Sequence, residues 1–223
     1  MPLIFVNELF ASIQGEGFYT GCPSVFVRLQ GCLCQCPWCD TKYTWKLGKP
    51  NETTLADILQ KEDRPGYATT TAQELSSYIL ATYPEIPLVV ITGGEPCLFD
   101  LTELTQRLIE GGKLVQIESS GTEPVNVASG TFVTISPKVN MPGKREVLPS
   151  ALRRADEIKM VIASPEDLAL LDSLLVEAPH CPRISLQPLS QNPDATAFCV
   201  KTIMERGQRY RLSLQTHKFI HVR

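Results

Sequence analysis

Short apolar runs alternate along this chain with longer segments of helical periodicity. Seven runs of four to six residues are rich in Val, Ile and Leu, and we predict that each is a strand: 24–29, 88–92, 114–118, 131–135, 157–162, 183–187 and 211–214. Between them, apolar residues recur with helical spacing in 71–83, 101–112, 165–176 and 194–206. Repeated strand-then-helix units predict an α/β fold with a parallel sheet, whose continuous apolar strands would be covered on both faces.

The number of strands limits the architecture. Six or seven are too few for a closed eight-stranded barrel, so we expect an open, partial TIM-like barrel of about six parallel strands. A chain of 223 residues with 43% hydrophobic residues fits a single domain, 1–223, with its own core. A polar stretch at about 46–70, punctuated by Pro and Gly and containing a short helix near 54–61, is interpreted as an insertion in the loop after the first strand.

Polar and glycine-rich loops follow five of the predicted strands. Ligand-binding loops gather at the carboxyl ends of parallel strands, so these loops should meet at one edge of the sheet. The loops are 32–39, which is rich in cysteine, 93–96, 119–122, 136–138 and 187–190. We therefore predict one ligand site built from all five.

The first of these loops carries the most specific chemistry. Cys32, Cys36 and Cys39 are spaced CxxxCxxC, and Trp38 precedes the last thiol. Three thiolates on one short loop can hold three irons of a 4Fe–4S cube and leave the fourth iron free for a small molecule. An open iron is what reductive cleavage of S-adenosylmethionine requires. The spacing is similar to the signature of the radical S-adenosylmethionine superfamily.

The cysteines also allow other interpretations. Cys34 lies inside the loop, so Cys32, Cys34, Cys36 and Cys39 could make a four-thiolate zinc site. The alternation of Cys32 with Cys34 would make a shared tetrahedron cramped, and a second pair of ligands is missing from the sequence. Eight unevenly clustered cysteines do not resemble a secreted disulfide scaffold. The iron–sulfur interpretation is therefore favoured, with Cys34 as a bystander.

Three further features suit a small-molecule site. The strand-end sequence Thr92-Gly-Gly-Glu-Pro96 is either a tight turn or a loop lying against a ligand, in which Glu95 could receive an ammonium group. Arg28, inside an apolar strand, needs either a structural carboxylate or an anionic ligand. Thr41 could donate an oxygen to a hard cation such as Mg²⁺.

Taken together, these segments resemble one family closely, that of 7-carboxy-7-deazaguanine synthase. The matching segments follow in order over nearly the whole chain: 7–8, 13–17, 26–32, 36–41, 90–97, 116–122, 135–138 and 214–218. The departures from the family pattern are Cys34 and the insertion at about 46–70. Neither touches the matched positions.

The resemblance implies a radical S-adenosylmethionine lyase of queuosine biosynthesis. It would convert 6-carboxy-5,6,7,8-tetrahydropterin to 7-carboxy-7-deazaguanine with release of ammonia, using a 4Fe–4S cluster, S-adenosylmethionine and Mg²⁺. A homodimer and an electron donor of the flavodoxin or ferredoxin type are also implied.

The resemblance also assigns residues. The cluster would be bound by Cys32, Cys36 and Cys39, and Mg²⁺ by Thr41. Contacts to the pterin are implied for Ile13, Gln14, Gly15, Arg28 and Thr92, with Glu16 and His217 as further candidates. Contacts to S-adenosylmethionine are implied for Gly94, Ser136, Pro137, Lys138, Gln187, Pro188, Leu189 and Ser190.

Charge and composition narrow the alternatives. A net charge of −3 argues against a broad nucleic-acid surface. The amino terminus lacks a basic start, and no apolar run approaches the ~20 residues that span a bilayer, so we expect a cytoplasmic protein without a membrane partner. The competing functions are a glycyl-radical activating enzyme, which would have no use for Arg28 and Thr41 around a carboxylated small molecule, and a non-catalytic zinc module.

Overall fold

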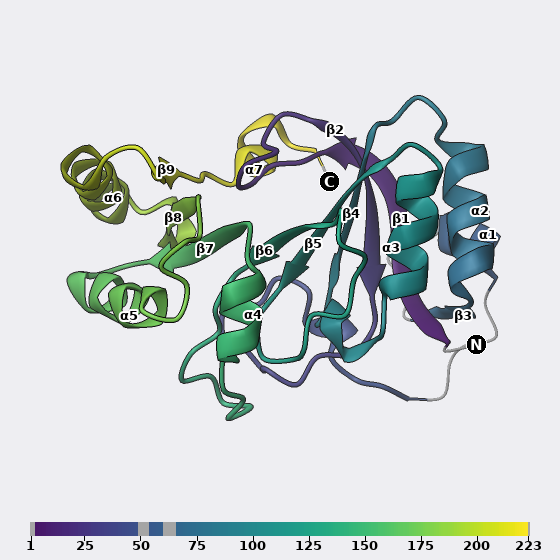
Figure 1. Cartoon of the computed structure of the whole chain (residues 1–223), viewed down its shortest axis with the longest axis horizontal. Coiled ribbons are helices and arrows are strands. Elements are labelled where there is room, and N and C mark those ends of the chain that lie inside the picture. The colour runs from purple at the N-terminus through teal and green to yellow at the C-terminus, as the bar shows by residue number, and fades with distance from the viewer. Residues whose placement is uncertain (1–2, 49–53, 60–65, 223) are drawn as a thin grey trace.

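One curved sheet forms the body of the molecule. The computed structural model describes residues 3–48, 54–59 and 66–222, and its nine strands follow the order β3-β1-β2-β4-β5-β6-β7-β8-β9 (Figure 1). The strands are β1 Ile4–Ile13, β2 Pro23–Leu29, β3 Ala68–Thr70, β4 Leu88–Gly93, β5 Leu114–Ser119, β6 Phe132–Ile135, β7 Glu157–Ile162, β8 Ile184–Pro188 and β9 Tyr210–Leu212. Every neighbouring pair from β2 to β9 is parallel. The predicted open α/β fold is confirmed, with seven parallel strands.

Helices cover the outer face of this sheet (Figure 1). The helices on this face are α1 Leu55–Leu59, α2 Ala72–Thr82, α3 Thr102–Glu110, α4 Pro149–Arg154, α5 Pro165–Leu175 and α6 Pro193–Arg206. The seventh helix, α7 Thr216–Ile220, lies elsewhere, and the 3-10 turns are Lys42–Thr44, Pro96–Leu98 and Leu189–Gln191. Side-chain caps fix three of the helix starts: Thr71 accepts from Glu74 N, Asn192 accepts from Asp194 N, and Ser164 forms a capping box with Asp167. All four helices predicted from periodicity are present.

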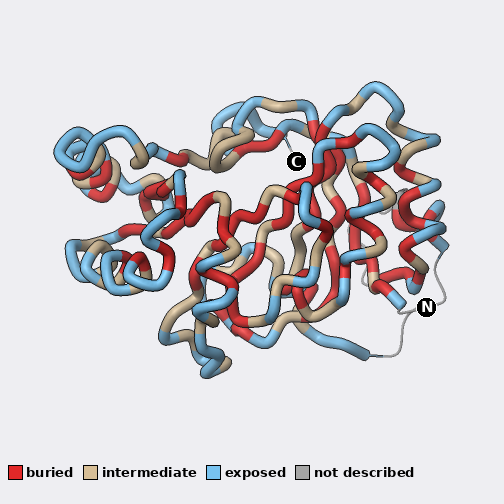
Figure 2. The backbone as a smooth tube through the Cα atoms, in the orientation of Figure 1, coloured by how far each residue is buried: buried red, intermediate tan, exposed pale blue. Residues whose placement is uncertain are grey.

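The two faces of the strands differ in polarity. Successive side chains of a strand point to opposite faces, and in β5 the buried Val115 and Ile117 belong to the apolar core, while Gln116 and Glu118 occupy the alternate positions. Most of the other parallel strands share this pattern, whereas β4 has the apolar Leu88 and Val90 at its alternate positions, and buried residues follow the strands through the molecule (Figure 2). The strands are thus buried on both faces, as expected, but many of the buried side chains on the inner face are polar, such as Gln116, Thr134 and Glu157.

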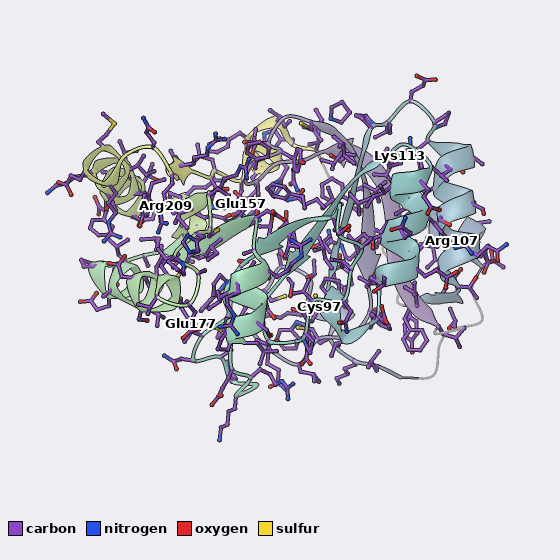
Figure 3. The ribbon with its side chains drawn as sticks, in the orientation of Figure 1. Cys97, Arg107, Lys113, Glu157, Glu177 and Arg209 are labelled. Carbon is purple, nitrogen blue, oxygen red and sulfur yellow. The ribbon has the colours of Figure 1, made fainter. Side chains whose placement is uncertain are left out.

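Hydrogen bonds between strands satisfy the polar inner face. Gln14 Nε2 donates to Gln116 Oε1 over 3.0 Å, and Gln116 Nε2 donates to Thr134 Oγ1 over 3.0 Å. Thr134 Oγ1 and Ser185 Oγ then donate to the two carboxylate oxygens of Glu157, at 3.1 and 2.5 Å. Glu157 is fully buried (Figure 3). Polar residues can lie here because the donors and acceptors of these side chains pair with one another.

The open side of the sheet is closed by two segments far apart in sequence. The connection between β1 and β2 meets the segment from Ser213 to α7, as Gly17 N donates to Ser213 Oγ over 2.9 Å and Thr216 N donates to Gly15 O over 2.9 Å. α7 accordingly lies beside the β1–β2 hairpin (Figure 1). A Cβ on Gly15 would lie 2.2 Å from His217 Nδ1, so the close approach requires glycine there.

Four elements were not predicted from the sequence: β1, β3, α4 and α7. Within the predicted insertion at 46–70, α1 and β3 join the main fold, because Leu55 and Ile58 enter the core and β3 pairs with β1. The remainder of the insertion includes 49–53 and 60–65, which lie outside the described residues. Among the residues that the structure describes, no helix combines the length and apolar character that crossing a bilayer requires.

Candidate active site

Two adjoining cavities lie at the carboxyl ends of the parallel strands. The larger has a volume of about 250 Å³ and the smaller about 220 Å³. The residues that line both are Glu16, Asp40, Thr41, Thr92, Gly93 and Glu118. The cavities therefore share a wall, which is made by the cysteine loop, the β1–β2 connection and the ends of β4 and β5.

The cysteine loop lies along the larger cavity. Cys32, Cys36 and Cys39 all line it as free thiols, as predicted. Cys34 also lines the cavity, but it is buried, and its sulfur lies 3.6 Å from Thr122 Oγ1. The sulfur of Cys39 receives a hydrogen bond from Trp45 Nε1 over 3.4 Å. The loop thus presents the three predicted ligands to one space.

The thiol pKa values reflect burial and mutual contact. Burial raises the pKa of Cys36 to about 11, with Cys34 and Cys39 adding to the increase and Lys138 opposing it. A hydrogen bond with Cys32 lowers the pKa of Cys34 to about 6 despite burial, and the same bond, together with burial, raises the pKa of Cys32. Metal binding would have to displace these thiol protons.

The donor set fits a cube better than a single ion. Within the described ranges, no three Cys, His, Asp or Glu side chains converge on a point where one metal ion could sit. Thiolates of a 4Fe–4S cube each bind a different iron, so they need not converge on one point. The three sulfur donors that line the larger cavity therefore suit a cluster with one open iron.

The residues predicted to contact S-adenosylmethionine line the same cavity, with one exception. Gly94, Ser136, Lys138 and the run from Gln187 to Ser190 border it, whereas Pro137 is buried and does not. Lys138 Nζ donates to Ser136 Oγ over 2.7 Å, and burial lowers the pKa of Lys138. Gln187 Oε1 is buried without a hydrogen-bond partner among the described residues. A cosubstrate with amino groups could supply the missing N–H.

Gly93 and Gly94, at the end of β4, allow the backbone to pack closely against neighbouring segments. Gly93 has a φ of +130°, and a Cβ on it would lie 2.2 Å from Leu29 N. A Cβ on Gly94 would lie 2.1 Å from Gly31 O. Glycine is therefore needed so that the end of β4 can touch the end of β2 and the start of the cysteine loop.

The Glu95 carboxylate is buried and is hydrogen-bonded to other residues of the chain. Its carboxylate is 1% exposed and accepts hydrogen bonds from Cys97 N, Ser119 Oγ and Ser120 N, at 2.9, 2.8 and 2.8 Å. The expectation that Glu95 could receive an amino group is not met, because both of its oxygens already join the loops after β4 and β5.

The smaller cavity gathers the residues predicted to contact the pterin. They are Ile13, Gln14, Gly15, Arg28 and Thr92, together with Glu16 and His217. Arg28 Nε donates to Glu8 Oε2 over 2.6 Å, and Tyr43 Oη donates to the same oxygen over 3.2 Å. Arg28 thus meets both of its predicted alternatives. It pairs with the structural carboxylate of Glu8, and it borders a cavity that could hold an anionic ligand.

Two charged residues that line the larger cavity, Lys159 and Glu118, were missed from the sequence. Lys159 is 3% exposed, and its Nζ lies 2.6 Å from Glu16 Oε2 and 2.7 Å from Glu118 Oε2. Burial works to raise the pKa of Glu16, but the charge and hydrogen bond of Lys159 outweigh it and lower this pKa to about 2. Lys159 stands in an apolar strand as Arg28 does, so the argument used for Arg28 could have found it.

Comparison with known proteins places this geometry in a family. Residues 13–134 match the family described as a 4Fe-4S single cluster domain. The crystal structure of QueE from Escherichia coli superposes with a TM-score of 0.91, at 44% identity, over 96% of this chain and 95% of that one. The 7-carboxy-7-deazaguanine synthase of Escherichia coli K12 is 44% identical over 97% of this chain and 98% of that protein. The enzyme of that name from Buchnera aphidicola is 40% identical over 98% of both.

The fold and the cysteine loop together define a radical S-adenosylmethionine enzyme. An open parallel sheet carries three cysteine thiols after its first parallel strand, beside a cavity lined by the ends of the following strands. Within that class, the chain belongs to the 7-carboxy-7-deazaguanine synthase family.

Proposed function

We propose that this chain converts 6-carboxy-5,6,7,8-tetrahydropterin to 7-carboxy-7-deazaguanine and releases ammonia. The observation that carries the proposal is the pair of joined cavities. The larger one holds the three predicted cluster ligands and most of the residues expected at S-adenosylmethionine, and the smaller one holds the residues expected at the pterin. The shared wall would bring cosubstrate and substrate into contact.

The residues of the larger cavity would bind the cluster and the cosubstrate. Cys32, Cys36 and Cys39 would hold the cluster in the larger cavity. When bound, the cluster would supply the electron for cleavage of S-adenosylmethionine, and the cosubstrate would supply the adenosyl group that takes a hydrogen atom from C6 of the substrate. Gln187 would accept an N–H of the cosubstrate at its unpaired Oε1.

In the smaller cavity, charge recognition would fix the substrate. Arg28, oriented by Glu8, offers a guanidinium to the substrate carboxylate. Thr41 and Asp40 border both cavities and offer the hard oxygen atoms that Mg²⁺ prefers. A Mg²⁺ ion that keeps several waters would need only these donors and the substrate carboxylate, so the residues fit the ion.

The proposal extends to the electron donor, the oligomeric state and the location of the enzyme. A low-potential one-electron donor of the flavodoxin or ferredoxin type would reduce the cluster, and the chain would act as a cytoplasmic homodimer without nucleic-acid or membrane partners. The acidic net charge of −3 supports the absence of a nucleic-acid surface. Family membership does not favour the alternatives of a glycyl-radical activating enzyme or a zinc module.

Anaerobic turnover with product identification tests the proposal. Reconstituted protein is incubated with carboxytetrahydropterin, dithionite, Mg²⁺ and S-adenosylmethionine, and the products are identified by mass spectrometry. We expect 7-carboxy-7-deazaguanine and ammonia in equal amounts. A protein that holds about four irons and four sulfides per chain but yields no deazaguanine would refute the assignment.

The ligands are tested with a matched pair of variants. Cys36→Ala should abolish both the cluster absorbance and turnover. Cys199→Ala is the control, since Cys199 is buried in the core away from the cavities. Full cluster content in the Cys36 variant would refute the ligand assignment.

A further inference from the structure

Trp45 is joined to both ends of the cysteine motif. Its indole Nε1 donates to Cys39 Sγ over 3.4 Å, and its backbone carbonyl accepts from Cys32 N over 3.1 Å. Trp45 lines the larger cavity together with the three cysteines. The backbone bond fixes the indole next to the loop, so the contact with the sulfur belongs to a defined local geometry.

The direction of this hydrogen bond is not ambiguous. An indole N–H can only donate, whereas the Thr41 hydroxyl, 3.5 Å from the same sulfur, could donate or accept. A donor aimed at a thiolate withdraws negative charge from it. Hydrogen bonds to the sulfurs are among the factors that set the potential of an iron–sulfur cluster, because they stabilise the reduced, more negative state.

We infer that Trp45 is a tuning residue, which raises the reduction potential of the cluster held by Cys32, Cys36 and Cys39 through its hydrogen bond to Cys39. This inference rests on the proposed function, because it requires the cluster. It assigns Trp45 a role in how readily the cluster accepts an electron, apart from any contact with substrate.

Trp38 provides an internal control. It is the other of the two tryptophans in the chain and directly precedes Cys39. Its side chain is 50% exposed, and in the described part of the chain its indole donates to no thiol. Trp38 is thus next to Cys39 in sequence but donates no hydrogen bond to its sulfur. A comparison of Trp38 with Trp45 therefore isolates the effect of the hydrogen bond.

A redox titration of the reconstituted proteins, followed by electron paramagnetic resonance without substrate, tests the inference. The midpoint potential of Trp45→Phe should be more negative than that of the wild type, and that of Trp38→Phe should equal the wild type. In resonance Raman spectra, exchange into D₂O should shift an Fe–S(Cys) stretch in the wild type and in Trp38→Phe but not in Trp45→Phe. Equal potentials in all three proteins, or equal shifts in both variants, would overturn the inference.

Replacing Trp45 with benzothienylalanine separates the N–H from the shape of the ring. This residue keeps the bicyclic ring and lacks the donor, so it should reproduce the more negative potential even if the phenylalanine variant assembles poorly. Failure of both variants to hold a cluster would also overturn the inference, because the side chain would then act in loop assembly. A wild type that forms no 4Fe–4S cluster would refute the proposed function instead, so the two failures are distinguishable.

Discussion

Lys159 Nζ lies 2.6 Å from Glu16 Oε2 and so ties strand β7 to the glycine-rich connection between β1 and β2. Its second partner, Glu118 Oε2 on β5, lies 2.7 Å away. Both carboxylates border the two cavities, and the ammonium between them is buried. One cation thus holds two walls of the site in position.

Removing this cation should damage both stability and turnover. In Lys159→Met, two partly buried carboxylates would face each other without a counter-charge, and we expect the free energy of unfolding to fall by about 3 kcal/mol. Lys201→Met is the control, because its 3.9 Å pair with Glu205 is largely exposed and should contribute under about 0.5 kcal/mol. Urea unfolding measures the free energy of unfolding of both variants. Equal stabilities would show that the buried bridge contributes nothing.

The Glu16 carboxyl should make stability depend on acid pH. Its pKa in the folded chain is about 2, against an ordinary value of 4.5, so protons bind the unfolded state first as the pH falls. The stabilisation is complete above pH 4.5, declines below it and is lost near pH 2; it amounts to at most about 3 kcal/mol. The cluster-free wild type should lose more stability than Glu16→Gln between pH 5 and 3. Parallel curves for the two proteins would contradict this.

Arg28 should act on substrate affinity. Because Arg28→Ala removes a charge-assisted contact to an anion, we expect KM for the pterin to rise about 10- to 100-fold with the cluster content unchanged. Arg107→Ala is the control, since Arg107 pairs with Glu103 on the surface of α3. Steady-state kinetics with iron analysis measures both. A variant that loses its cluster would support a purely structural role.

Lys113 should stabilise the fold without affecting the site. Its Nζ donates to the carbonyls of Tyr83, Pro84 and Ile86, at 2.7, 2.8 and 2.7 Å, beyond the end of α2 (Figure 3). Lys113→Met leaves these carbonyls without their charged donor, and we expect a loss of about 2 kcal/mol. Thermal unfolding and turnover per folded molecule are the measurements. A changed KM would show that the effect reaches the cavities.

The parallel strands and long helices could be predicted because their patterns are local. Runs such as 88–92 and periodic segments such as 165–176 contain their own signal. Strand β1 could not be recognised in the same way, because Asn7 and Glu8 interrupt its apolar run and are buried only through partners elsewhere in the chain, such as Gln30 and Arg28. The short α4 and α7 offer too few residues for a periodic pattern.

The site shows the same division between local and tertiary information. The cysteine spacing and the polar loops after the strands identified most of the residues that line the larger cavity, and the family resemblance identified most of those that line the smaller one. The sequence could not show that Glu95 is occupied by Ser119 and Ser120, nor that Lys159 joins Glu16 to Glu118, since these contacts connect loops and strands far apart along the chain. Buried charges inside apolar strands are the signal by which such contacts could be sought.

The contact of Gly15 and Gly17 with Thr216 and Ser213 has a consequence for how the protein is made. During translation the first residues of the pocket leave the ribosome almost two hundred residues before the segment that completes its wall. A nascent chain therefore cannot enclose its ligands until the segment from Ser213 to Thr216 has been synthesised.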